Sequence, residues 1–325
     1  MVDSKNHQYG FKEREMQKID ITDKELLGFI GKQESQEIGA FNSYGDRLLK
    51  QLEGGTGLVG DKLPWSKTHN AVRLGQGQLS IWSGINGHGK TLLLSNVFTY
   101  LMARGRRCLV ASMEMKPEET LQWMCSQAAG CSPSRDFALG WLERMKEVGH
   151  IYDCLDKVPQ ERVLGLVHYA GQELDINHLA IDSLTMCGVG REDYTAQGEF
   201  VNQLRAAAKM YNMHIHLVCH MRKGSDENEQ VGKFSIRGAG EISDLADKVF
   251  VVFRNKAREK AMALKNNNFA FDEKFLNQPD VYLKLVKNRQ DGTELDFGLY
   301  FHKDSMQFTS KEGKAMPLEG NVSDY

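Results

Sequence analysis

The stretch LSIWSGINGHGKT, residues 79–91, places a short β-like run before a glycine-rich turn that ends in lysine and threonine. It fits the phosphate-loop pattern G-x-x-x-x-G-K-[ST], and an apolar helical run follows it from Leu92, as that pattern requires. Glycines let backbone amides turn toward a polyphosphate, and the positive end of the following helix favours the anion. The stretch therefore predicts a nucleotide site, with the lysine amine on the outer phosphates and the threonine hydroxyl on Mg²⁺, formed by Gly84, Asn86, Gly87, Gly89, Lys90 and Thr91.

Composition limits the classes of protein to which the chain can belong. Its 325 residues are 41% hydrophobic and 26% charged, with a formal net charge of −2, which excludes a uniformly basic nucleic-acid-binding surface. The six cysteines form no C-x-x-C pair, which predicts reduced thiols and no structural zinc. We find no run of about 18 apolar residues, so we expect no membrane contact and a cytoplasmic location, in a bacterial or virus-infected cell.

The chain divides into an arm, one large domain and a tail. Residues 1–50 are polar, and Thr22 and Glu25 form a capping box before a short amphipathic helix, which packs either on its own domain or on a neighbouring subunit. In residues 51–309, β-like runs at 79–82, 107–112, 176–181 and 214–219 alternate with helical runs at 90–103, 117–146 and 197–211. This alternation predicts an α/β fold with a mostly parallel sheet between helices, followed by later strands at 248–253, 281–286 and 297–301 that end antiparallel. We expect residues 310–325 to form a disordered tail.

Two acidic residues follow predicted strands and can act on a nucleotide. Asp182 ends an apolar run, the arrangement by which phosphate-loop proteins hold Mg²⁺, although a turn aspartate is a common alternative. Glu114 follows the run 108–112 and would lie at the same crevice, where it could deprotonate a water molecule that attacks the γ-phosphate. The alternative for Glu114 is a surface residue in the first turn of the next helix.

Several segments, in order, resemble the DnaB and Twinkle type hexameric replicative helicases, which are RecA-like motors of superfamily 4. They are the phosphate loop, SMEM at 112–115, IDSL at 181–184, LVCHMRK at 217–223, IRGAG at 236–240 with SDLAD at 243–247, and KNR at 287–289 with Asp291 and Gly292. The resemblance covers about residues 55–309 and leaves the arm unassigned. It implies a RecA-like P-loop NTPase fold, ATP or another NTP with Mg²⁺, a homo-oligomeric, hexameric ring, and single-stranded DNA at a replication fork. A primase or loader would be a separate polypeptide.

The same resemblance implies roles for individual residues. Glu114 matches the catalytic base, Asp182 the Mg²⁺ ligand, and His220 the residue that senses the γ-phosphate. Lys287 and Arg289 match cations that cross a subunit interface to the neighbour's nucleotide; a solvated hairpin edge is the alternative. For DNA contact, the expected residues are Arg222, Lys223, Lys233, Arg237, Gly238 and Gly240, unless this segment is a surface loop of mixed charge.

One further pattern invites a metal-site interpretation. His214, His216 and His220 lie on one face of a predicted strand. The last two are two strand steps apart, ~13 Å along the chain, which is too far for one ion. We therefore favour a coupling histidine at the strand end.

The motifs together predict an ATP-dependent, ring-shaped replicative DNA helicase that moves on single-stranded DNA and unwinds duplexes. One alternative is a RecA-like recombinase or loader that binds DNA under ATP control without processive unwinding. A second is an ATPase or kinase that does not act on DNA. The first alternative would form open filaments on DNA without strand displacement, and the second would hydrolyse ATP at a rate that single-stranded DNA leaves unchanged.

Overall fold

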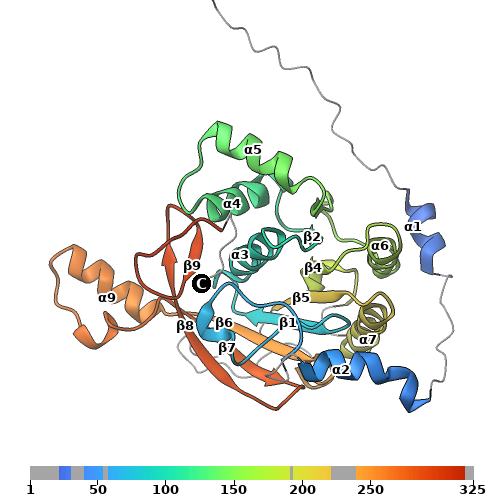
Figure 1. Ribbon diagram of the computed structural model, residues 1–325. Coiled ribbons are helices and arrows are strands. Elements are labelled where there is room, and N and C mark those ends of the chain that lie inside the picture. The colour runs from blue at the N-terminus through green and yellow to red at the C-terminus, as the bar shows by residue number, and fades with distance from the viewer. Residues whose placement is uncertain (1–21, 31–39, 54–57, 191–192, 221–238, 319–325) are drawn as a thin grey trace, which may run out of the picture.

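A single mixed sheet forms the centre of the computed structural model, which describes residues 22–30, 40–53, 58–190, 193–220 and 239–318. The described residues form nine strands in the order β3-β2-β4-β5-β1-β6-β7-β8-β9 (Figure 1). The first six in this order are parallel and the last three antiparallel, which confirms the predicted RecA-like α/β architecture. The strands are β1 (Leu79–Gly84), β2 (Cys108–Ser112), β3 (Gly149–Ile151), β4 (His178–Asp182), β5 (His214–His220), β6 (Lys248–Arg254), β7 (Val281–Asn288), β8 (Leu295–His302) and β9 (Gln307–Thr309).

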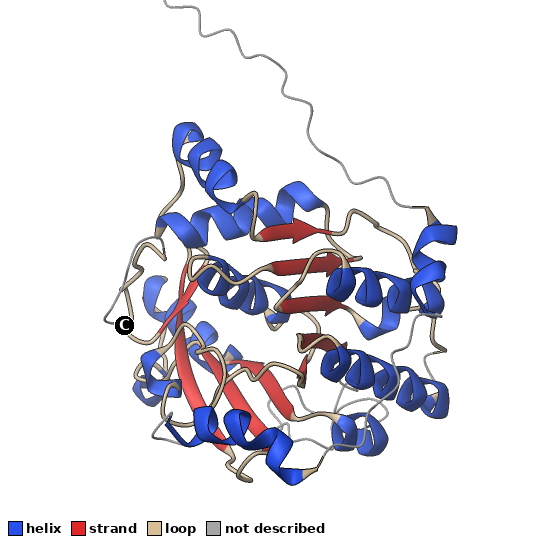
Figure 2. Cartoon of the chain, turned by 45° about the vertical axis from the view of Figure 1, so that its right-hand side comes forward, coloured by secondary structure: helices blue, strands red, loops and turns tan. Residues whose placement is uncertain are grey.

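Helices cover both faces of the sheet, as Figure 2 shows. They are α1 (Asp23–Ile30), α2 (Gly45–Glu53), α3 (Lys90–Met102), α4 (Pro117–Ala129), α5 (Arg135–Met145), α6 (Gln160–Gln172), α7 (Tyr194–Met210), α8 (Ala239–Leu245) and α9 (Lys256–Asn266). Side chains of a strand alternate between faces, so Ile81 packs in the core under α6 and α7, whereas Trp82 packs in the core under α3, α4 and α5. Burial on both sides holds β1, and with it the loop that follows, in a fixed position.

The structure differs from the sequence prediction in several elements. The helical region 117–146 is two helices, because Gly130 adopts a φ of 72° that ends α4. The prediction did not include α2, α6, α8, α9, β3 or β9. Within residues 310–318, where we expected disorder, the last residues lie against the end of α4: the Leu318 amide donates to the Ala128 carbonyl oxygen at 3.0 Å, and the Leu318 side chain is buried.

The N-terminal arm contributes a helix that packs on its own domain. The capping box is confirmed, since the Thr22 amide donates to Glu25 Oε2 at 2.8 Å and the Glu25 amide to Thr22 Oγ1 at 3.3 Å. Leu26 is fully buried against α6, where a Cβ on Gly165 would lie 2.6 Å from the Leu26 carbonyl oxygen. The described structure thus has the first of the two arrangements expected for this helix. Among the described residues, no helix combines the length and apolar character needed to span a membrane.

Candidate functional site

The phosphate loop connects the carboxyl end of β1 to the first turn of α3. A Cβ on Gly84 would lie 2.5 Å from the carbonyl oxygen of Val252, so glycine is required for the loop to pass beside β6. Gly89 has a φ of 84° and precedes α3, which begins at Lys90. The Lys90 side chain is buried, and its Nζ donates to the carbonyl oxygens of Gly84 at 3.0 Å and Ile85 at 3.3 Å. A buried cation therefore lies inside the loop, where it can neutralise a polyphosphate.

A hydroxyl and a carboxylate meet next to this cation. Thr91 Oγ1, in the first turn of α3, donates at 2.5 Å to Oδ2 of Asp182, the last residue of β4. Burial raises the pKa of Asp182, and burial also lowers the pKa of Lys90. Both shifts disfavour the charged forms, so a divalent cation with its phosphates would supply the missing countercharge. Mg²⁺ takes oxygen ligands and keeps several waters, and the Thr91 and Asp182 oxygens fit that preference.

The predicted base lies in a hydrogen-bonded group at the same edge of the sheet. Glu114 follows β2, and its Oε1 accepts from Ser183 Oγ at 2.7 Å and from His220 Nε2 at 3.4 Å. The hydrogen bond from His220, then that from Ser183 and the charge of Lys90, lower the pKa of Glu114 to about 2, against the effect of burial. The structure thus brings together Glu114, Asp182 and His220, three residues 38 or more positions apart in the chain.

Lys287 and Arg289 lie elsewhere on their own chain. Lys287 Nζ donates to the Asp244 carbonyl oxygen at 2.9 Å, at the end of α8, and the Arg289 guanidinium donates to the same oxygen and to Asp247 Oδ1. Asp247 Oδ2 in turn accepts from the Leu79 amide at 2.9 Å, where β1 begins. The phosphate loop leaves the other end of β1, five residues or about 17 Å away along the strand. These cations are therefore at the opposite edge of the sheet from the nucleotide site of their own chain.

Two other sets of predicted residues can be placed in part. Of the expected DNA contacts, Gly240 lies in the first turn of α8. The others lie outside the described residues: Arg222, Lys223, Lys233, Arg237 and Gly238.

His214 and His216 are fully buried within the sheet, where His214 Nε2 and Ser80 Oγ are 2.8 Å apart. They are thus separate from the group around His220.

Sequence reasoning missed two contacts at the site. Ser183 was noted only as a replacement for a second acid, whereas its hydroxyl bonds to Glu114; its place directly after Asp182 was the available signal. Arg254 donates from Nη1 to the Gly87 carbonyl oxygen at 3.3 Å, and its amide donates to His88 Nδ1 at 3.2 Å. The end of β6 is thus hydrogen-bonded to the phosphate loop. Nothing in the sequence around Arg254 indicated this contact, because it depends on β6 lying beside β1.

Comparison with known proteins agrees with this geometry. The family model described as an AAA domain matches residues 71–226. A solved DnaB-like replicative helicase, described with its interactions with primase, superposes with a TM-score of 0.63 at 12% identity, covering 87% of this chain and 70% of that one. A second solved structure, described as an ATPase domain, gives a TM-score of 0.67 at 13% identity, covering 85% of this chain and all of that one. Over residues 71–226 this chain is thus similar to an AAA domain, and it shares the RecA-like α/β fold of the two solved structures, as its motifs predicted.

Proposed function

We propose that this protein is an ATP-dependent, ring-shaped replicative DNA helicase that translocates on single-stranded DNA and unwinds duplex DNA. The observation that carries the proposal is the division of the hydrolytic groups between two edges of one subunit. The phosphate loop, Asp182, Glu114 and His220 lie at one edge, and Lys287 and Arg289 at the other. A site that uses all of them needs two subunits.

At the loop edge, the residues have the chemistry that phosphoryl transfer to water requires. Lys90 would neutralise the β- and γ-phosphates, and Thr91 and Asp182 would hold Mg²⁺, which draws charge from the transferred phosphoryl group. Glu114 would orient and deprotonate the attacking water, and His220 would lie within reach of the γ-phosphate. Hydrolysis by such a site depends mainly on positioning, which the two buried faces of the sheet supply.

At the other edge, the cations are directed away from their own loop. Asp247 and the end of α8 hold Arg289 near the start of β1, and Gly84 lies about 17 Å farther along that strand. This distance is longer than the reach of the Arg289 side chain. A contact of this edge with the loop edge of another copy is head to tail, and repetition of a head-to-tail contact produces a closed ring or an open helix. In such a contact Arg289 would stabilise charge on the neighbour's phosphoryl group.

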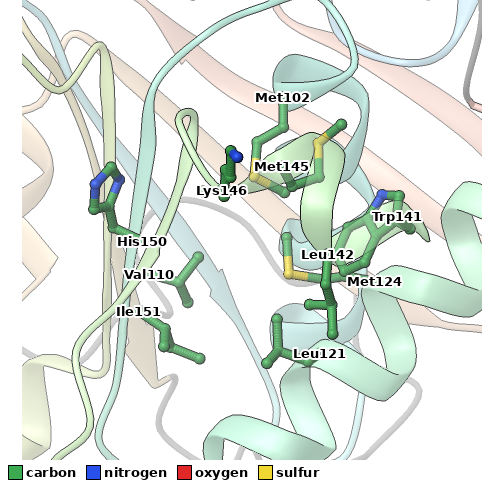
Figure 3. Close-up of a pocket in the computed structure, with 11 residues that line it drawn as sticks. Met102, Val110, Leu121, Met124, Trp141, Leu142, Met145, Lys146, His150 and Ile151 are labelled. Carbon is green, nitrogen blue, oxygen red and sulfur yellow. The ribbon is translucent and has the colours of Figure 1, made fainter. Parts of the chain in front are cut away.

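The arm offers a second contact between copies. Phe41, Tyr44, Leu48 and Leu52 recur at helical spacing, and Leu48 and Leu52 on α2 are 55% and 66% exposed. An apolar cavity of about 240 Å³ opens between β2, β3, α4 and α5 (Figure 3). Among its lining residues are Met124, Trp141 and Leu142. In Figure 1, α2 lies near the bottom of the view and α5 at the top, with the sheet between them. We propose that α2 of one subunit occupies this cavity on the next.

DNA contact would come from the segment before α8. Arg222, Lys223, Lys233 and Arg237 bring positive charge to one stretch of a chain whose net charge is −2, and Gly238 and Gly240 let a phosphate backbone approach closely. A ring would gather these segments around a central channel.

The test is ATP hydrolysis with and without single-stranded DNA, together with strand displacement on a forked duplex and native mass spectrometry. We expect DNA-stimulated hydrolysis, displacement and a closed oligomer. Open filaments on DNA without displacement would instead favour a recombinase or loader. A hydrolysis rate that DNA leaves unchanged would favour an ATPase that does not act on DNA.

A further inference from the structure

Ser183 lies at the centre of the group around the candidate base. Its side chain is fully buried at the end of β4, and its Oγ lies 2.7 Å from Glu114 Oε1, 2.7 Å from Thr185 Oγ1 and 3.2 Å from His220 Nε2. One hydroxyl therefore touches the candidate base, the candidate phosphate sensor and a third polar side chain. The proposed function gives Ser183 no role.

The direction of each hydrogen bond follows from the groups involved. An ionised carboxylate only accepts, so Ser183 gives its single proton to Glu114. Thr185 must then donate to Ser183. His220 Nε2 faces the same carboxylate oxygen and the Ser183 oxygen, so it carries a proton shared between both acceptors. Thr185, Ser183 and Glu114 thus form a directed chain, with His220 as a second donor.

The two donors to Glu114 differ in length. Ser183 is at 2.7 Å, the usual length for a hydrogen bond from a hydroxyl, whereas His220 is at 3.4 Å, beyond the usual range for a hydrogen bond from a nitrogen. A γ-phosphate oxygen, which is also an anionic acceptor, would compete for the His220 proton. When that proton turns to the phosphate, Ser183 is the donor that keeps Oε1 of Glu114 in place.

We propose that Ser183 is a positioning residue for hydrolysis: its hydroxyl fixes the Glu114 carboxylate while His220 engages the γ-phosphate. The proposal rests on the proposed function, because it takes Glu114 as the base. It explains why a hydroxyl is buried at this point, and it predicts that the base stays oriented after its contact with His220 is lost. Both donors also stabilise the ionised carboxylate, which is the form that accepts a proton from water.

The decisive variant is Ser183→Ala, compared with Ser183→Thr, which keeps the hydroxyl. We expect Ser183→Ala to lower kcat about tenfold or more, the value of one hydrogen bond to a charged group, with KM for ATP within about twofold. Ser183→Thr should recover most of kcat. Thr185→Val is the matched control: it removes the outer hydroxyl but leaves the bond from Ser183 to Glu114, so kcat should stay within about threefold of the parent.

Thermal unfolding and binding of a fluorescent ATP analogue, measured on each variant, establish that the fold and the nucleotide site are intact. If Ser183→Ala does not fold, Ser183→Cys keeps the shape of the side chain, with a slightly larger and weaker donor atom, and should also lower kcat. A parental kcat in Ser183→Ala would overturn the positioning role, as would a folded Ser183→Thr as slow as Ser183→Ala. The variant Glu114→Gln distinguishes a failure of the proposed function from a failure of the role of Ser183. Parental hydrolysis in that variant would show that Glu114 is not the base. An inactive Glu114→Gln beside a parental Ser183→Ala would refute only the role of Ser183.

Discussion

A chain of buried histidines crosses the sheet and should make the fold sensitive to acid. Trp82 Nε1 donates to His216 Nδ1 at 3.0 Å, and since an indole only donates, this nitrogen carries no proton. The His216 proton is then on Nε2, which donates to His178 Nδ1 at 3.1 Å. His178 Nε2 in turn donates to Asp61 Oδ2 at 3.0 Å. Every donor in this chain has its acceptor when His216 and His178 are both neutral.

Protonation would break this arrangement. Burial, and then the neighbouring His214, lowers the pKa of His216 well below its usual value, and burial has the same effect on the pKa of His214. The unfolded chain binds protons on these residues below a pKa of about 6.5, while the folded chain does not. The neutral histidines therefore make their full contribution to the free energy of unfolding above that pH, and this free energy falls as the pH drops below it.

The size of the loss follows from the linkage relation. For a histidine that stays neutral when folded, a change from pH 7.5 to 5.5 costs about 1.4 kcal/mol, which makes about 2.7 kcal/mol for His214 and His216 together. Burial also lowers the pKa of the histidines at 69, 150, 168 and 178, so the whole chain should lose more than this. A single variant isolates one contribution from that total.

The perturbation is His216→Gln, and the assay is urea unfolding followed by circular dichroism at pH 7.5 and 5.5. The variant should be less stable at both values, because the Trp82 and His178 contacts are altered, but its loss between them should be smaller than the parent's by about 1.4 kcal/mol. Ser80→Ala is the control. It removes the hydroxyl 2.8 Å from His214 Nε2 without removing an ionisable group, so it should keep the parental pH dependence.

A loss of stability between pH 7.5 and 5.5 that is as large in His216→Gln as in the parent would refute this prediction. That outcome would mean that His216 takes up a proton in the folded protein at pH 5.5. Carboxylates whose pKa is lowered, such as that of Asp61, lose their contribution only nearer a pKa of about 3.9 and do not affect the comparison.

Two other predictions concern assembly. Arg289→Ala and Lys90→Ala should each be inactive in ATP hydrolysis, but mixed together they should regain a fraction of the parental rate, because some interfaces then pair an intact loop with an intact arginine; an absence of rescue at every mixing ratio counts against a contribution in trans. Leu48→Glu with Leu52→Glu should shift the oligomer to monomer in native mass spectrometry with little change in the melting temperature of the isolated subunit, since both side chains are exposed there. Lys62→Glu, another charge change at an exposed position, should leave the oligomer intact, and equal behaviour of the two charge variants would remove α2 from the interface.

Local sequence was sufficient for much of the fold. The strands β1, β2, β4 and β5 form where predicted, because each is a short run that is mostly buried on both faces. The prediction missed the strands β3 and β9, which have three residues each and whose geometry depends on pairing with β2 and β8, and it also missed longer helices such as α6 and α9. The sequence of residues 310–318 likewise did not indicate that Leu318 would pack against the end of α4.

In the candidate site, too, some features could be predicted from the local sequence and others depended on the tertiary structure. The phosphate loop could be read from its own residues, since the glycines and Lys90 act through local backbone geometry. That Asp182 and Glu114 share a crevice could be inferred from parallel strands, whose carboxyl ends meet at one edge. The tertiary structure alone decided that Ser183 joins Glu114 to His220, and that Arg289 lies a strand length from its own loop. Those facts depend on strand order and register, which arise from packing between segments far apart in the chain and leave no mark in the local sequence.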